Sequence, residues 1–132
     1  MTTLTAAVNR PAFLRRVLLV DAATCVATGA LLSLDAAPLA PLLGLPAELL
    51  RYAGLSLFPI AAFMAWVATR QVPPHPGAWL IIAGNAAWVL GSALLFIPFS
   101  PTLLGYAFVI AQAAAVALLA ELEYVGLRRA AS

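Results

Sequence analysis

The stretch Leu103–Tyr124, with the sequence LLGYAFVIAQAAAVALLAELEY, decides the fold class. Only the amide of Gln112 interrupts this apolar run before the glutamates near its end. About 20 apolar residues in a helix, rising 1.5 Å each, cross the roughly 30 Å hydrocarbon core of a bilayer. Three further stretches have this length and character, at residues 13–34, 48–69 and 78–97. The sequence therefore predicts an all-α membrane protein with four transmembrane helices.

The overall composition indicates the same class. The 132 residues are 64% hydrophobic and 9% charged, and their mean hydropathy is +1.03. A soluble domain has about 45–50% apolar and about 25% charged residues, so an ordinary water-soluble core is excluded. We predict a single domain over residues 1–132. Its one cysteine, Cys25, allows no disulfide bond within the chain.

Proline-rich breaks separate the four apolar stretches. Proline lacks an amide hydrogen and disfavours helix in the residue before it, so these clusters mark helix ends. The first break, Asp35–Leu45, is long and apolar, and we expect a short helix at the membrane interface with Asp35 as its N-cap. The other two breaks are tight turns, which make the helices they join antiparallel neighbours. The predicted architecture is an antiparallel bundle.

The basic residues predict the orientation in the membrane. All seven are arginines beside apolar stretches, a placement typical of membrane topology rather than of nucleic-acid binding. If the N-terminus is cytoplasmic, Arg51 alone lies outside. The arginines on the inside are then Arg10, Arg15, Arg16, Arg70, Arg128 and Arg129. We predict a multi-pass protein of the bacterial inner membrane with both termini in the cytoplasm.

Four polar residues near the predicted cytoplasmic side form a candidate polar patch: Asp21, Arg70, Asn85 and Glu121. A carboxylate that faces lipid at this depth costs about 1–3 kcal/mol, so we expect these side chains to point into the bundle and meet one another. One interpretation is a proton or solute site with an arginine as counter-charge. The other is a set of anchors that only fixes the register of the helices.

Helical periodicity places other residues on faces. Thr24, Cys25 and Thr28 share one stripe with Asp21 on the first helix, and Trp88 and Ser92 share a side with Asn85 on the third. Pro59 interrupts the second helix, where we favour a fixed bend over a binding-site break. On the fourth helix a seam of small residues lines up with Glu121 and favours close packing. Its members are Ala107, Ala111, Ala114 and Ala117.

Gln112 and Glu123 lie on the opposite face of the fourth helix, about 20° apart around its axis. An amide at mid-membrane needs a protein partner, either a neighbouring helix of the same bundle or another subunit. We treat these two residues as a candidate interface for self-association or for a larger membrane complex.

The sequence contains no motif that predicts catalytic, cofactor-binding or metal-binding residues. The stretches LGLPAELLRYAGLSLFPIAAFMAWVATR, from residue 43, and GYAFVIAQAAAVALLAELEYVGLRRA, from residue 105, resemble helices of short, uncharacterised four-helix proteins of bacterial inner membranes. In size and layout the chain is also similar to DoxX-type proteins. That resemblance implies no activity. We expect an accessory or assembly subunit without its own catalysis, and the alternative is a small transporter or channel that uses the patch around Asp21.

Overall fold

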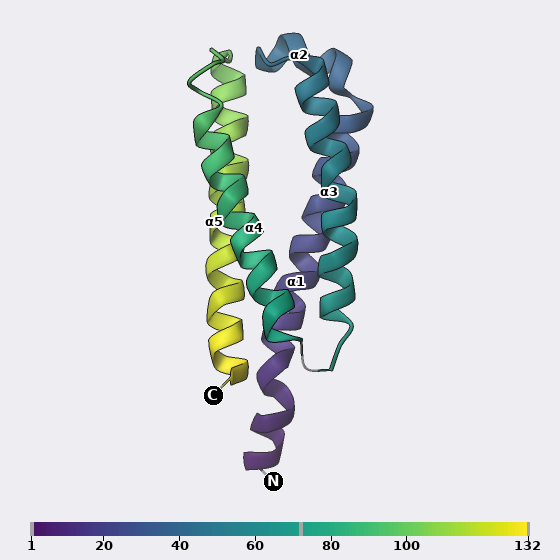
Figure 1. Cartoon of the computed structure of the whole chain (residues 1–132), viewed down its shortest axis with the longest axis vertical. Helices are drawn as coiled ribbons and strands as arrows, with labels where there is room; N and C mark the ends of the chain where they lie inside the picture. The colour runs from purple at the N-terminus through teal and green to yellow at the C-terminus, as the bar shows by residue number, and fades with distance from the viewer. Residues whose placement is uncertain (1, 72, 132) are drawn as a thin grey trace.

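The computed structural model describes residues 2–71 and 73–131, with side chains for 12–71 and 73–129, so Arg10 lies outside the described side chains. The described residues form five helices, as the sequence predicted (Figure 1). They are α1 (Thr2–Leu34), α2 (Ala36–Leu43), α3 (Ala47–Ala68), α4 (His75–Leu94) and α5 (Leu103–Ala131).

Four of these helices have the length and composition to cross a membrane: Ala12–Leu34, Ala47–Ala68, His75–Leu94 and Leu103–Arg129. Only 11% to 39% of the residues in their most apolar stretches are buried. Apolar side chains therefore cover the outer surface as well as the core, which is the arrangement that lipid requires. The chain is a multi-pass membrane protein.

Four helix boundaries differ from the prediction by three or more residues. α1 begins at Thr2 instead of residue 13, and α4 ends at Leu94 instead of residue 97. α4 begins at His75 instead of residue 78, because Pro76 in its first turn fits the helix without losing a hydrogen bond. α5 continues to Ala131 instead of ending at Tyr124. Gly126 lies within this extension, and a Cβ there would lie 3.0 Å from the Cα of Leu14, so the glycine lets α5 approach α1 closely.

The short helix α2 forms where the sequence predicted it. Asp35 occupies the N-cap position, but its side chain makes no capping hydrogen bond. Gly44 ends the helix in the left-handed region at φ 70°. Thr102 joins α2 to the start of α5, because its amide donates to the carbonyl oxygen of Leu43 at 3.1 Å and its hydroxyl donates to that of Leu42 at 2.6 Å.

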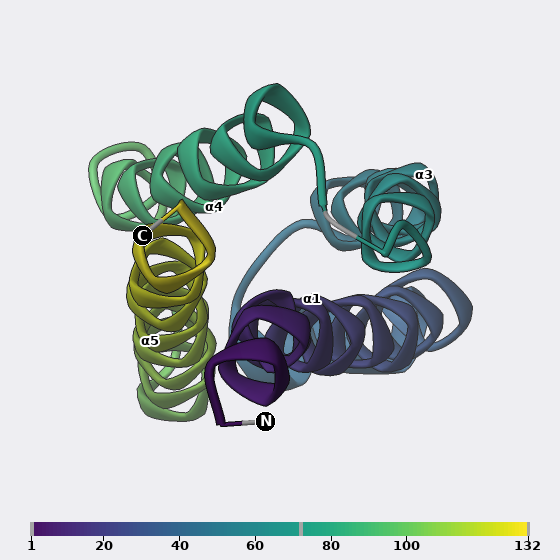
Figure 2. The same cartoon turned by 90° about the horizontal axis from the view of Figure 1, so that it is seen from below.

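The four long helices surround a central space in the order α1, α3, α4, α5 (Figure 2). α3 packs along α1 and α4 packs along α5, while α1 and α5 join the two pairs. α3 and α4 make the fewest contacts of these neighbours, although a short turn connects them. Both chain termini lie at the same end of the bundle (Figure 1). The bundle is thus two tight helix pairs with a weakly packed side between α3 and α4.

Candidate functional site

A buried polar cluster joins three of the membrane-spanning helices. Asp21 from α1, Asn85 from α4 and Glu123 from α5 are 1%, 6% and 0% exposed. The side-chain nitrogen of Asn85 donates to Asp21 Oδ2 at 2.8 Å and to Glu123 Oε1 at 2.8 Å. The other Asp21 oxygen accepts a weak contact of 3.8 Å from the thiol of Cys25. One amide therefore holds two carboxyl groups together inside the bundle.

The electrostatics of this cluster are unusual for a structural anchor. Because both carboxyl oxygens lie 2.8 Å from one nitrogen, they cannot be farther apart than twice that distance. No arginine is among the hydrogen-bond partners of either carboxyl group in the described part of the chain. The second oxygen of Glu123, Oε2, is buried and has no hydrogen-bond partner among the described residues. Two negative charges at this spacing repel strongly, and a shared proton or a bound cation would relieve the repulsion.

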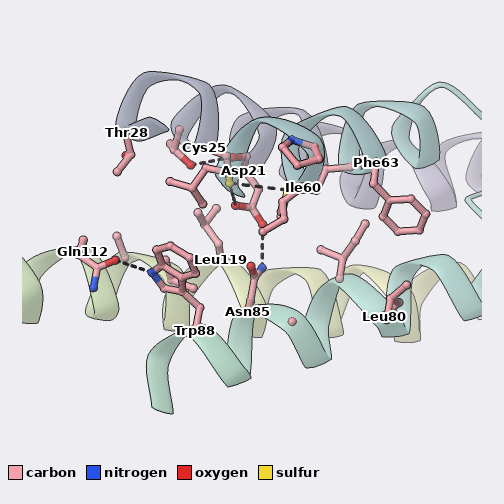
Figure 3. Close-up of a pocket in the computed structure, with 18 residues that line it drawn as sticks. Asp21, Cys25, Thr28, Ile60, Phe63, Leu80, Asn85, Trp88, Gln112 and Leu119 are labelled. Carbon is pink, nitrogen blue, oxygen red and sulfur yellow. Dashed lines mark hydrogen bonds between the residues drawn. The ribbon is translucent and has the colours of Figure 1, made fainter. Parts of the chain in front are cut away.

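A cavity of about 450 Å³ lies beside the cluster, and all four membrane-spanning helices contribute to its wall. Asp21 and Asn85 form part of the wall, and apolar side chains form most of the remainder (Figure 3). The predicted stripe of Thr24, Cys25 and Thr28 also lies along the cavity. The cavity thus combines an apolar volume with a polar, acidic patch on one side.

The cavity is partly open, and we assign its mouth to the least packed side of the bundle, between α3 and α4. Ile60 on α3 and Leu80 on α4 both line the cavity and are 37% and 62% exposed. These two helices make the fewest contacts of any neighbouring pair in the ring. Gly84, also in the wall, has no atom within 4 Å of the place that a Cβ would occupy. Since lipid surrounds the outer surface, this mouth faces the bilayer.

A second polar group closes the cavity farther from the termini. Gln112 Oε1 accepts a hydrogen bond from the indole nitrogen of Trp88 at 2.8 Å, and Gln112 Nε2 donates to the hydroxyl of Ser92 at 2.9 Å. Gln112 and Trp88 both line the cavity. The amide at mid-membrane therefore has two partners on the neighbouring helix α4, and it also donates to the carbonyl oxygen of Val109 on its own helix at 2.9 Å.

The structure brings together two members of the predicted polar patch, Asp21 and Asn85, and separates the other two. Glu121 is exposed on the outside of α5, and the placement predicted for it is wrong. Arg70 is exposed beyond the end of α3, where it lies over the ring of Trp66 at 5.0 Å, so it is not the counter-charge. Glu123 occupies the place that we predicted for Glu121.

Of the two partners considered for Gln112 and Glu123, a neighbouring helix or another subunit, the structure shows the neighbouring helix. Both side chains lie on the inner face of α5, where α4 supplies their hydrogen-bond partners. Burying this face satisfies two polar side chains at once, whereas burying the alanine seam would satisfy only Glu121. Ala107, Ala111 and Ala114 of that seam are exposed. The number of polar residues on each face of α5, rather than the size of its residues, therefore indicates which face is buried.

The contribution of α3 to the site was not predicted. Leu57, Ile60 and Phe63 form part of the cavity wall, and nothing distinguishes them in the sequence from side chains that face lipid. Pro59 also lines the cavity and is the one signal in this stretch that pointed toward a binding site.

Comparisons of the chain with protein-family models, with characterised proteins and with solved structures each find no match. The resemblance drawn from the sequence therefore stays at the level of a four-span helical membrane layout.

Proposed function

We propose that the chain is a small transporter that binds its solute in the central cavity. The observation that carries the proposal is the position of the buried Asp21–Asn85–Glu123 cluster, two members of which, Asp21 and Asn85, line a cavity walled by all four spans. Ionisable groups inside a membrane are costly and mark solute or ion pathways in membrane proteins. A cluster that only fixed helix register would not need an adjoining cavity.

The cluster would bind the polar part of the solute, a proton, or each in turn. The carboxyl group of Asp21 lines the cavity, and that of Glu123 is bound to the same Asn85 amide behind the cavity wall. These acceptors complement a hydrogen-bond donor or a cation. The apolar wall would exclude water and so strengthen each polar contact that the solute makes.

We also propose that the termini lie in the cytoplasm of a bacterial cell and that the protein resides in the inner membrane. The support is the arginine distribution: Arg51 is near the end of the bundle that holds α2, and the other described arginines flank the end that holds the termini. The polar cluster would then lie between the middle of the membrane and its cytoplasmic face.

The accessory-subunit interpretation stays a prediction without a structural observation in its favour. The sequence favoured it because no motif for an activity is present and because the polar patch could be a set of anchors, and the interface expected at Gln112 and Glu123 has partners inside the bundle instead. We therefore rank the transporter first.

Cys25 offers a direct test, because it lines the cavity and is the only cysteine in the chain. A transporter opens its binding site to each side of the membrane in turn. Charged, membrane-impermeant methanethiosulfonate reagents should therefore modify Cys25 in proteoliposomes whether they are added outside or trapped inside. Mass spectrometry of the intact protein measures the modified fraction, and a Cys25→Ala variant is the control.

Modification from both sides supports the transporter. If Cys25 reacts only after the protein is unfolded in detergent, water never reaches the cavity and the proposal is wrong. Reaction from a single side would also contradict transport, because it would show a binding site open to one compartment only.

A further inference from the structure

We propose that the solute is an amphipathic amine, with a protonated nitrogen and an apolar body, and that it enters from the bilayer between α3 and α4. This inference rests on the proposed function and adds the chemical class of the substrate. It follows from the charges around the cavity, from the character of its wall and from the position of its mouth.

The charges select against an anion. Asp21 is the one ionisable acid among the described residues that line the cavity, and no arginine or lysine is among them. Glu123 does not line the cavity, but it is bound to Asn85 in the wall and adds a second carboxyl group nearby. An ammonium group has three donors and no acceptor, so it complements a site made of carboxyl oxygens. A carboxylate or phosphate would meet repulsion and no compensating positive side chain.

The buried oxygen of Glu123 needs a donor, and Glu123 itself is not among the residues that line the cavity. Oε2 is fully buried, and a buried acceptor without a partner is costly unless something donates to it. Asn85 cannot supply that donor in the arrangement seen, because its nitrogen already bonds Glu123 Oε1 and Asp21 Oδ2. A proton shared between the carboxyl groups of Glu123 and Asp21 would supply that donor.

The wall selects for an apolar body. The volume of about 450 Å³ falls in the range of about 300–1,000 Å³ that is usual for small-molecule sites. Ile60, Phe63 and Leu119 line it beside the polar patch, and Trp88 adds an aromatic ring (Figure 3). Such a wall favours hydrocarbon chains or rings, and aromatic faces also attract cations. A small hydrophilic amine would leave most of this surface without a partner.

The mouth determines the route. Ile60 and Leu80 are apolar, exposed side chains on opposite edges of the least packed side of the bundle. A molecule dissolved in the bilayer reaches this mouth without crossing water. The geometry therefore favours a solute that first partitions into the membrane, with its nitrogen directed toward Asp21.

The test uses the indole of Trp88 as a reporter in the cavity wall. Replacing Trp66 and Trp79, which are 50% and 47% exposed, with phenylalanine leaves Trp88 as the only tryptophan. Three ligands with the same brominated undecyl chain and different heads are titrated into nanodiscs that contain this protein: 11-bromoundecylamine, 11-bromoundecanol and 11-bromoundecanoate. Bromine quenches indole fluorescence on contact. Each ligand concentration is expressed as its mole fraction in the membrane, which removes differences in partitioning.

We expect saturable quenching by the amine at about one tenth of the concentration that the alcohol needs, since a charge-assisted hydrogen bond is roughly twice as strong as a neutral one. The carboxylate should bind more weakly than the alcohol. In Asp21→Asn the advantage of the amine should disappear while binding of the alcohol remains. Gly84→Leu should remove saturable quenching by all three ligands, and Gly91→Leu, whose position lies outside the cavity wall and has no atom within 4 Å of a Cβ, should keep it.

The outcomes separate the two proposals. If none of the three ligands gives saturable quenching in the parent protein, the cavity does not bind such molecules and the inference of an amphipathic amine fails, whereas the transporter proposal is decided by the modification of Cys25. If Gly84→Leu removes binding but the alcohol or the carboxylate binds as tightly as the amine, the cavity is a binding site and the assignment of an amine is wrong. If Asp21→Asn still binds the amine more tightly than the alcohol, the assignment of an amine is wrong as well. If the Asp21 variant does not fold, Glu123→Gln provides the same comparison.

Discussion

Asn85→Leu should lower the free energy of unfolding by about 2–6 kcal/mol, the cost of leaving two buried acceptors without a donor at about 1–3 kcal/mol each. The amide of Asn85 is the hydrogen-bond donor that Asp21 Oδ2 and Glu123 Oε1 share. Leucine has similar size and no donor, so the two carboxyl groups would face each other without an intervening polar group. Unfolding in mixed micelles with increasing SDS, followed by circular dichroism, measures the change.

The double variant Asn85→Leu/Glu123→Leu provides the control. It also removes the carboxyl group of Glu123, which Asn85→Leu leaves without a donor. The double variant should therefore be more stable than Asn85→Leu alone, and the effects of the two substitutions on the free energy of unfolding should be non-additive. An unchanged unfolding midpoint for Asn85→Leu would show that the cluster does not stabilise the bundle.

Gly54→Leu should prevent α1 and α3 from packing and cost about 3 kcal/mol or more, at the upper end of overpacking effects. A Cβ at position 54 would lie 2.7 Å from the backbone nitrogen of Ser33 and 2.8 Å from the carbonyl oxygen of Gly29. Both are backbone atoms, so no rotation of a side chain can relieve the contact. Since these helices form the closest pair in the bundle, we expect little folded protein after purification.

Gly91→Leu is the matched control, because it introduces the same side chain where no atom lies within 4 Å. Its elution volume in size-exclusion chromatography and its helical content should match those of the unsubstituted chain. Equal yields of folded protein for the two variants would contradict the close backbone contact between α1 and α3.

The fold was predictable because hydropathy and proline position act locally. Each apolar stretch needs only its own length to be assigned as a membrane span, and prolines such as Pro73 and Pro74 separate one span from the next. The short helix between Asp35 and Leu45 was predictable for the same reason. The ends of the helices were less predictable, because the extension of α5 through Gly126 depends on its contact with Leu14 on α1.

The candidate site was predictable in part. Asp21 and Asn85 could be paired because each is an isolated polar residue on an apolar helix, and burial among protein atoms is the cheapest arrangement for both. The choice between Glu121 and Glu123 depended on which face of α5 packs. Two residues correspond to about 200° around a helix, so only one of these glutamates can face the bundle.

The cavity itself was beyond prediction from sequence. The cavity exists because α3 packs along α1 and α4 packs along α5. This pairing leaves α3 and α4 apart along most of their length. The same apolar residues would fill the centre if all four helices packed evenly. Ile60 and Phe63 therefore become wall residues through tertiary structure and not through any local pattern.

The central claim is that the cavity beside Asp21 accepts molecules from the bilayer, and the most direct measurement is the rate at which N-ethylmaleimide modifies Cys25 in nanodiscs. This reagent is small and lipid-soluble, and Cys25 lies in the cavity wall. We predict that Gly84→Leu, which places a side chain in the empty space of the cavity, slows the reaction about tenfold, as expected for a barrier higher by about 1.4 kcal/mol. Gly91→Leu should react at the rate of the unsubstituted chain. Equal rates for Gly84→Leu and the unsubstituted chain, with both proteins folded, would contradict the claim.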